Sequence, residues 1–318
     1  MLEKYDKAVS LFLKNTELNE CTEDTITGYA RICRLYREYL AQNGYEEASM
    51  EASLAWRQSL EDRSAVTVDL YMRVIQYLSD FAVDMNIYSD RFMSKKLFPK
   101  RKQVSKERNK EYEHLLSEDD VRELLSATRA NFGRTSHTFV REKALVGMAL
   151  LTGARNIELR NLTVADLDWN NSVIYARVTK GGKPRMLPFP EMLQNLVYAY
   201  LSSGIRPVNL TNDETLFGRV SREGVWTPYE REYTSIMIHN YVRSVLGEEK
   251  AVYSHALRHS FASLALSCSM DIASISTVLG HSDIRTTKIY AKHLHPEKLA
   301  ADFGNQMVAL MQRKEESA

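Results

Sequence analysis

The sequence predicts a mainly helical protein of two domains, with one small β-hairpin in the second domain. Three observations support this: a length of 318 residues, apolar residues at helical spacing along most of the chain, and one alternating, β-branched segment that ends in a glycine turn. A single core rarely grows beyond about 250 to 300 residues, so two domains are expected. We place them at residues 1–94 and 113–318, joined by a basic linker at residues 95–112.

The bulk composition is typical of a globular protein in a reducing compartment. Hydrophobic residues make up 44% and charged residues 26% of the chain. No apolar run reaches the roughly 18 residues of a membrane span, and the N-terminus does not resemble a signal peptide. Cys21, Cys33 and Cys268 are spaced too widely for a disulfide framework or a zinc site. We therefore expect a cytoplasmic protein.

Helical signals organise the first domain. A long helix is expected from Thr25 to Gln42, ended by Gly44, and a second long helix is expected after the cap residue Ser64. Shorter helices near residues 2–15 and 50–60 complete the domain. The apolar face of the first long helix comprises Tyr29, Ile32, Cys33, Tyr36 and Leu40. That of the second comprises Val68, Met72, Ile75, Tyr77, Leu78 and Phe81.

The second domain begins with a helix start and ends with an amphipathic helix. Ser117-Glu-Asp-Asp120 has a capping residue followed by acids in the first turn. A very apolar helix follows at about residues 141–151 and ends at Gly153. The stretch near residues 203–230 is expected to be mainly loop. The last helix, at residues 296–313, has Leu299, Phe303, Met307, Leu310 and Met311 at helical spacing.

A β-hairpin is expected in the middle of this domain. Residues 172–178 alternate and are β-branched, residues 179–183 (TKGGK) form a turn, and residues 185–189 form the second strand.

Positive charge is concentrated in one short segment. Residues 1–94 hold 10 Lys/Arg and 16 Asp/Glu, residues 95–110 hold 8 basic residues and one acid, and residues 111–318 hold 24 of each. The segment suits either a phosphate backbone or a solvated linker. On the first long helix, Arg31, Arg34 and Arg37 recur at every third position. They too suit either a phosphate backbone or a solvated face. The candidate DNA contacts are Arg31, Arg34, Arg37, Lys95, Lys96, Lys100, Arg101 and Lys102.

Two segments pair a basic residue with a turn. In TGARNIELRNL, Arg155 follows a helix-ending glycine and Glu158 comes three residues later, so the carboxylate can hold the guanidinium group. A purely structural ion pair is the alternative. Lys180 lies at the tip of the hairpin, where a lysine is usually solvated but is also able to reach a substrate.

Two further segments contribute histidines, an arginine and a tyrosine. His255, Arg258 and His259 share one helix face, and the arginine makes a metal site a poor interpretation. In LGHSDIRTTKIY, His281 precedes a helix that carries Tyr290. A tyrosine on a helix is most often a packing residue, so Tyr290 alone indicates little.

Together these residues indicate phosphoryl transfer without a metal. Arginines hold non-bridging oxygens and neutralise transition-state charge, a histidine or lysine transfers protons, and a tyrosine attacks phosphorus and keeps the bond energy as an ester. No acidic dyad for Mg²⁺ and no GxxxxGK[ST] loop are present in the sequence. We therefore expect no cofactor.

The order and wording of these segments resemble the tyrosine recombinase (phage integrase) family. TGARNIELRNL is similar to its first arginine box, VTKGGKPRMLPF to its lysine hairpin, and HALRHSFAS and LGHSDIRTTKIYAK to its second box and nucleophile box. The resemblance extends from about residue 113 to the end. The helical first 90 residues resemble the family's core-binding domain by pattern alone.

The resemblance implies a role for each matched residue. Arg155 and Arg258 would grip the scissile phosphate, and His281 would add a hydrogen bond to it. Lys180 would protonate the leaving 5′ oxygen, and His255 would act as general base. Tyr290 would form a 3′-phosphotyrosine. Glu158 would orient the first arginine box, and His259 is expected to be structural. The departures from the pattern are Ala154, Asn156, Ser269 and Met270.

The resemblance also implies partners. A helical and a catalytic domain would clamp double-stranded DNA, and recombination would proceed in a homo-tetramer on two DNA sites. The protein would be a monomer or weak oligomer without DNA, and the helix at residues 296–313 would dock on a neighbouring protomer. We expect a simple two-domain enzyme, similar to Xer proteins or to integrases of mobile elements. A directionality or accessory factor is compatible with this scheme.

Two other functions fit parts of the same pattern. A type IB topoisomerase uses similar chemistry to relax supercoils, and a sequence-specific DNA-binding regulator of this fold would bind without cleavage. The intact set of catalytic residues favours an active recombinase. Integration, excision, dimer resolution and inversion share one active site, so the sequence does not choose among them.

Overall fold

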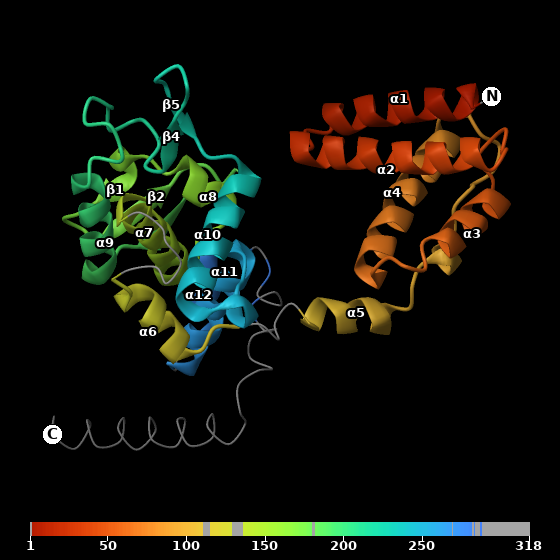
Figure 1. Ribbon diagram of the computed structural model, residues 1–318. Helices are drawn as coiled ribbons and strands as arrows, with labels where there is room; N and C mark the ends of the chain where they lie inside the picture. Colours follow the sequence, from red (N-terminus) through yellow and green to blue (C-terminus); the bar gives the residue numbers. More distant parts are fainter. Residues whose placement is uncertain are drawn as a thin grey trace, which may run out of the picture. The chain divides into compact units, whose positions relative to one another are not determined.

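A computed structural model describes residues 2–110, 115–128, 136–179, 182–268, 270–281, 283 and 287. The chain divides into two compact units, Met1–Glu111 and Tyr112–Ala318 (Figure 1). Lys180, Tyr290 and the expected C-terminal helix at residues 296–313 lie outside the described residues. Among the described helices, none combines the length and apolarity that a membrane crossing requires.

The first unit is helical, as predicted. α1 packs against both α2 and α4, and Figure 1 shows α1 and α2 running side by side above α4. Its helices are α1 (Glu3–Leu18), α2 (Glu23–Gln42), α3 (Met50–Ser59), α4 (Ala65–Asp84), the 3-10 helix η1 (Lys95–Leu97) and α5 (Arg101–Lys110).

The predicted apolar faces form the core of this unit, with one exception. The fully buried residues of the two faces are Ile32, Cys33, Tyr36, Leu40, Val68, Met72, Ile75 and Leu78. Tyr29 and Phe81 are half-buried and pack against this core. Tyr77 is 47% exposed, because it lies two residues from Ile75 and so on the opposite side of the helix. Ser64 caps α4 as predicted, accepting a hydrogen bond from the Thr67 amide at 3.1 Å.

The basic segment after α4, expected only as a linker, is mostly helical in its described part. Val104 is buried, and α5 packs against α4. The Glu107 carboxylate accepts a hydrogen bond from the Val66 amide at 3.2 Å, in the first turn of α4. Val104 and Glu107 therefore connect this helix to the rest of the first unit. The five candidate DNA contacts of the segment, Lys95, Lys96, Lys100, Arg101 and Lys102, are all exposed.

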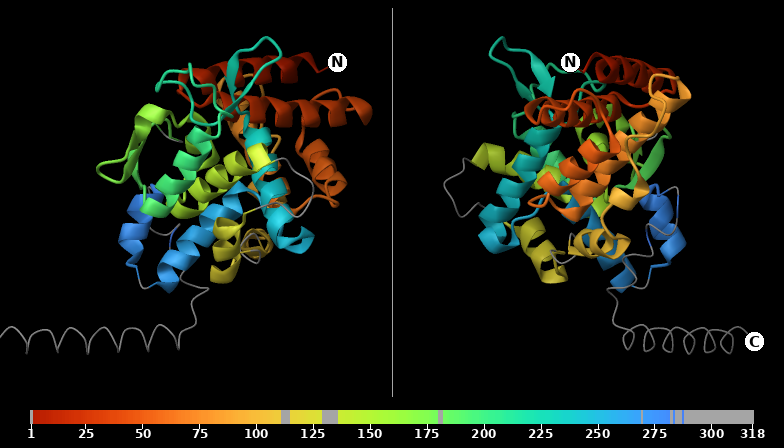
Figure 2. Two further views of the ribbon diagram at one scale, coloured as in Figure 1. Left: turned by 60° about the vertical axis from the view of Figure 1, so that its left-hand side comes forward. Right: turned by 90° about the vertical axis from the view of Figure 1, so that its right-hand side faces the viewer.

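The second unit is built around α7, which packs against α6, α9, α10 and α11 (Figure 2). The helices of this unit are α6 (Glu118–Ser126), α7 (Ser136–Thr152), α8 (Asn156–Asn161), η2 (Val164–Asp166), α9 (Glu191–Ser202), α10 (Arg231–Leu246), η3 (Glu248–Lys250), α11 (Ser254–Ser267) and α12 (Ile272–Leu279). α6 begins with the predicted capping box, in which Ser117 and Asp120 each accept a hydrogen bond from the other's amide, at 3.2 and 2.9 Å.

The predicted hairpin is present and belongs to a three-stranded antiparallel sheet. The strands are β1 (Leu167–Asp168), β2 (Val173–Ala176) and β3 (Arg185–Pro188), in the order β1-β2-β3. β1 was not predicted, because two residues are too short to show alternation. Residues 203–230 are mainly loop, as expected, but they also contain a second hairpin, formed by β4 (Gly218–Val220) and β5 (Trp226–Pro228), whose strands are too short to show alternation.

Gly153 ends α7 as predicted, and its surroundings explain why a glycine is needed. Its φ of 61° lies in the left-handed region. A Cβ atom there would lie 2.6 Å from Phe261 Cδ1 and 2.8 Å from Leu279 Cδ2. The turn therefore brings the end of α7 into direct contact with α11 and α12.

We predict that Gly153→Ala destabilises the second unit more than Gly224→Ala does. Gly224 has a similar φ of 79° but open space around it, so its substitution reports the backbone strain alone, about 1 to 2 kcal/mol. At Gly153 the overpacking against Phe261 and Leu279 adds about 1 to 3 kcal/mol. Urea unfolding of both variants measures the difference, and equal losses would contradict the packing argument.

Candidate functional site

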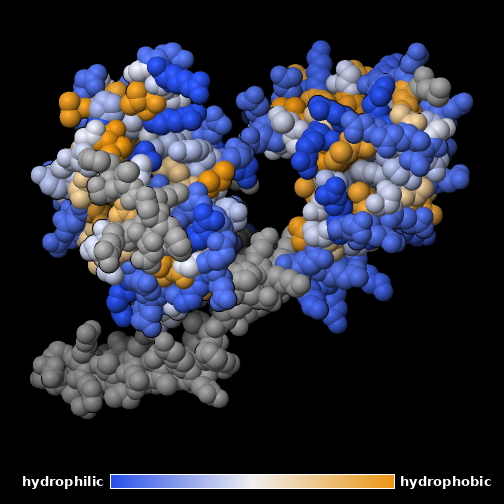
Figure 3. All heavy atoms as spheres, viewed as in Figure 1, coloured by the Kyte–Doolittle hydropathy of each residue, from blue (hydrophilic) through white to orange (hydrophobic). Residues whose placement is uncertain are grey.

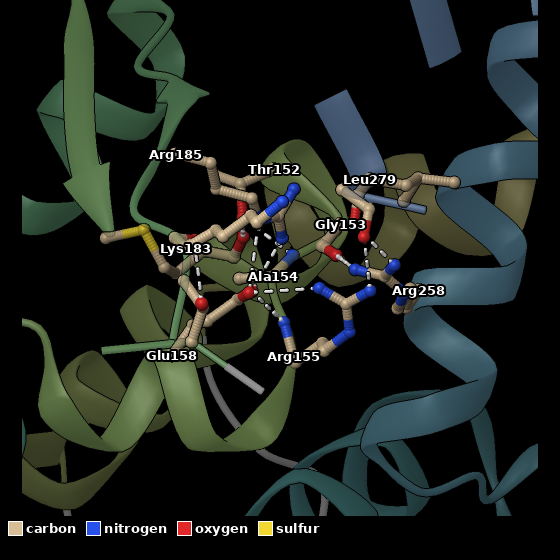
Figure 4. Close-up of polar contacts among 12 residues, drawn as sticks. Thr152, Gly153, Ala154, Arg155, Glu158, Lys183, Arg185, Arg258 and Leu279 are labelled. Carbon is tan, nitrogen blue, oxygen red and sulfur yellow. Dashed lines mark hydrogen bonds and ion pairs between the residues drawn. The ribbon is translucent and has the colours of Figure 1, made fainter. Parts of the chain in front are cut away.

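The site is centred on the turn that links α7 to α8. Arg155 is the N-cap residue of α8, and its amide donates a hydrogen bond to Glu158 Oε2 at 2.6 Å. Its Nη1 donates to Glu158 Oε1 at 3.2 Å. The ion pair proposed from the three-residue spacing is therefore present, and it places the guanidinium group beside the start of the helix (Figure 4).

Glu158 has a second and closer partner that the sequence did not reveal. Arg185 of β3 donates from Nε to Oε1 at 3.0 Å and from Nη2 to Oε2 at 2.6 Å. The Glu158 side chain is fully buried. Burial would raise the pKa of Glu158, but hydrogen bonds and charge from Arg185 and then Arg155 outweigh it and lower that pKa. The sequence feature that could have indicated this contact is an arginine soon after the hairpin turn. In the folded sheet that residue, Arg185, lies opposite the buried Ala176.

Arg258 reaches the same place from α11. Its side chain is buried, and it donates from Nη1 to the Gly153 carbonyl at 2.6 Å and from Nη2 to the Leu279 carbonyl at 2.7 Å. Arg155 Nη2 donates to the next carbonyl, Gly280, at 2.8 Å. Two predicted phosphate ligands, more than a hundred residues apart in sequence, therefore converge on the C-terminal end of α12 (Figure 4).

The predicted histidines border these arginines. His255 and His259 lie one turn apart on α11, with ring centroids 6.2 Å apart. Burial, followed by His255 and Arg258, lowers the pKa of His259 to about 4. His281 follows the Gly280 turn, and its Nδ1 lies 2.7 Å from Thr287 Oγ1. Burial, followed by Arg258, Arg155 and Arg185, lowers the pKa of His281 to about 4.

At neutral pH His281 is therefore an uncharged imidazole. Where the Thr287 hydroxyl donates to Nδ1, the single ring proton resides on Nε2 and makes that atom a hydrogen-bond donor. Three guanidinium groups and one carboxylate lie together in this part of the described structure. This surplus of positive charge suits an anion with several oxygen acceptors, such as a phosphodiester.

The remaining predicted site residues are either outside the described residues or part of the first unit. Lys180 and Tyr290 lie outside the described residues. Arg31, Arg34 and Arg37 are exposed on α2 of the first unit. Arg37 is paired with Asp6 at 2.5 Å, and Arg31 donates to the Tyr71 hydroxyl at 3.4 Å. The surface of each unit in the view of Figure 3 is mainly hydrophilic, so it does not single out this row of arginines. A role for the row in DNA binding stays a prediction.

We predict that the DNA-free protein loses stability as the pH falls from about 6.5 to about 4. In this window an unfolded chain with ordinary histidine pKa values near 6.5 binds protons that folded His259 and His281 do not bind. Protonation therefore favours the unfolded state. Melting temperatures measured from pH 7 to pH 4.5 test this, and His281→Asn should flatten the slope. An unchanged slope in that variant would contradict the assignment.

Known proteins similar to this chain fall into one group. The family model described as "Phage integrase family" matches residues 114–297. Tyrosine recombinase XerD of Bifidobacterium longum (strain NCC 2705) is 29% identical over 197 residues, covering 58% of this chain and 59% of that protein. Tyrosine recombinase XerD of Oceanobacillus iheyensis (strain DSM 14371) is 24% identical over 282 residues, covering 85% and 87%. The chain spans 50–59% of the length of the first three curated relatives.

A solved structure shares the fold. XerH site-specific recombinase, bound to a palindromic difH substrate in a post-cleavage complex, matches with a TM-score of 0.69. The match covers 87% of this chain and 78% of that chain at 19% identity. This likeness supports a helical fold with small antiparallel sheets, as the sequence predicted.

Proposed function

Because the chain belongs to the phage integrase family, we propose that it is a site-specific DNA recombinase that cleaves and rejoins strands through a 3′-phosphotyrosine. The observation that carries this proposal is the meeting of Arg155, Arg258 and His281 at one turn. Such a set of donors fits the non-bridging oxygens of one phosphodiester.

The proposed reaction exchanges one phosphoester for another. The Tyr290 oxygen attacks phosphorus, the bond to the 5′ oxygen breaks, and His255 accepts the phenolic proton while Lys180 supplies a proton to the leaving oxygen. Arg155 and Arg258 neutralise the charge that builds on the phosphate oxygens. In rejoining, a 5′ hydroxyl attacks the phosphotyrosine and the protons return. Because the ester keeps the bond energy, we propose that neither ATP nor a metal is required.

The two units would have different roles on DNA. We propose that the first unit, with α5 and the row of Arg31, Arg34 and Arg37, binds double-stranded DNA while the second unit performs the chemistry. Recombination would use a homo-tetramer on two DNA sites, with the segment at residues 296–313 docking on a neighbouring protomer. XerH bound to its difH substrate is among the similar structures, which supports DNA as the partner, and we propose that the protein acts in the cytoplasm.

Covalent trapping tests the chemistry directly. We expect the protein to form an SDS-stable, protease-sensitive adduct with DNA from its genetic neighbourhood, without metal or ATP, and Tyr290→Phe to abolish it. Tyr198→Phe is the matched control, because Tyr198 is 67% exposed on α9 and should keep the adduct. Tight binding without any adduct would favour a regulator that binds DNA without cutting. Relaxation of plasmids lacking a specific site would favour a topoisomerase.

The salt dependence of binding tests the role of α5 and the residue before it. Replacing the exposed Lys100, Arg101 and Lys102 by glutamine should weaken DNA binding for all sequences and reduce the slope of log K against log salt by about 2 to 3. Arg122→Gln is the control, because Arg122 is exposed but already paired with Glu118 at 2.7 Å. An unchanged slope in the triple variant would mean that the basic segment is a solvated surface that does not contact DNA phosphates.

A further inference from the structure

Arg185 is the principal partner of Glu158, although neither the motifs nor the proposed chemistry give it a role. Arg185 donates two hydrogen bonds in a fork to the Glu158 carboxylate, from Nε to Oε1 at 3.0 Å and from Nη2 to Oε2 at 2.6 Å. The Arg155 side chain makes one contact with the same carboxylate, at 3.2 Å. Because a two-point guanidinium–carboxylate pair fixes orientation as well as distance, the Arg185 side chain holds Glu158 more firmly than the Arg155 side chain does, and the Arg155 amide adds a further contact at 2.6 Å.

Arg185 also touches two other parts of the site. It belongs to β3, where it pairs with Ala176 of the lysine-bearing hairpin. Its side-chain stem lies against Gly280, where a Cβ atom would come within 2.9 Å of Arg185 Cδ. One side chain therefore joins the hairpin, the turn before His281 and, through Glu158, the start of α8 (Figure 4).

The hydrogen bonds of Arg185 commit most of its guanidinium group to Glu158. The Arg185 side chain is 10% exposed, and Nη1 is buried without an acceptor in the described part of the chain. Nε and Nη2 are used by Glu158.

We propose that Arg185 is a positioning residue that fixes the Glu158 carboxylate and, through it, the guanidinium group of Arg155. This inference rests on the proposed strand-cleavage function. Without Arg185, the buried carboxylate keeps a single basic neighbour, so its pKa rises and Arg155 loses its fixed place beside the phosphate. A lysine at this position restores the charge but cannot form the fork.

A double-mutant cycle with single-turnover cleavage tests this role. The substrate is a nicked duplex containing the site mapped by covalent trapping, and the full-length variants are Arg185→Gln, Arg155→Gln and the double substitution. Arg185→Gln should slow cleavage by about 100-fold. If Arg185 acts through Arg155, the double variant should cleave no more slowly than Arg155→Gln alone. Arg185→Lys should recover part of the rate.

Arg177→Gln is the matched control for the hairpin. Arg177 also pairs with a buried carboxylate, Asp166, at 2.7 Å, but it is 66% exposed and has no contact with Glu158. Its substitution should leave the cleavage rate close to that of the wild type. Melting temperatures of all variants show whether each is folded, and if Arg185→Gln is not, Arg185→Lys in the Arg155→Gln background carries the same comparison.

The outcomes separate the inference from the function it rests on. If the two losses multiply in the double variant, Arg185 acts independently of Arg155 and the positioning role is overturned. A wild-type rate in Arg185→Gln overturns it as well. Absence of cleavage by the wild-type protein overturns the proposed function, and the inference with it.

Discussion

The site depends on one buried carboxylate held between two arginines. A fully buried charge is costly unless it is paired and hydrogen-bonded, and Glu158 receives four N–H groups from Arg155 and Arg185. These contacts hold the start of α8 and strand β3 in one arrangement. Removing either partner would leave the carboxylate under-compensated, so the geometry of Arg155 is coupled to the hairpin.

A second layer of contacts ties this pair to α12. Arg258 bridges the carbonyls of Gly153 and Leu279, and Arg155 donates to Gly280. The C-terminal end of a helix carries partial negative charge on its unpaired carbonyls, so the arginines are attracted to it in the DNA-free state. Burial, followed by the positive charge of Arg258, Arg155 and Arg185, lowers the pKa of His281 and so keeps its imidazole neutral.

The sequence predicted the parts of the site that lie within short motifs. Arg155 and Glu158 are three residues apart, and His255, Arg258 and His259 follow one helical period, so local spacing was sufficient to group them. Arg185 was missed because its partner is 27 residues away and only the folded hairpin brings them together. The Thr287 contact of His281 was missed for a similar reason, since a spacing of six residues does not by itself place a threonine beside a histidine.

The fold could be predicted from the sequence to a similar extent. Helices with a full apolar face, such as α2 and α4, were located because burial requires a regular period. Strands of two or three residues carry no such period, so β1, β4 and β5 did not appear. The helix α5 was also unexpected, because its charge dominates its composition while a single buried valine and Glu107 hold it in place.

Gly280 shows how closely packing and chemistry are joined in this site. Its φ of 62° favours glycine, but space imposes a second requirement. A Cβ atom would lie 2.9 Å from Arg185 Cδ, so a larger residue would displace the Arg185 side chain, and it would also contact Arg155 Nη1 at 3.4 Å. The glycine thus serves the helix end and the guanidinium groups at once. This turn leads directly to His281, so displacement of Arg185 would also change one of the charges that, together with burial, lower the pKa of that imidazole.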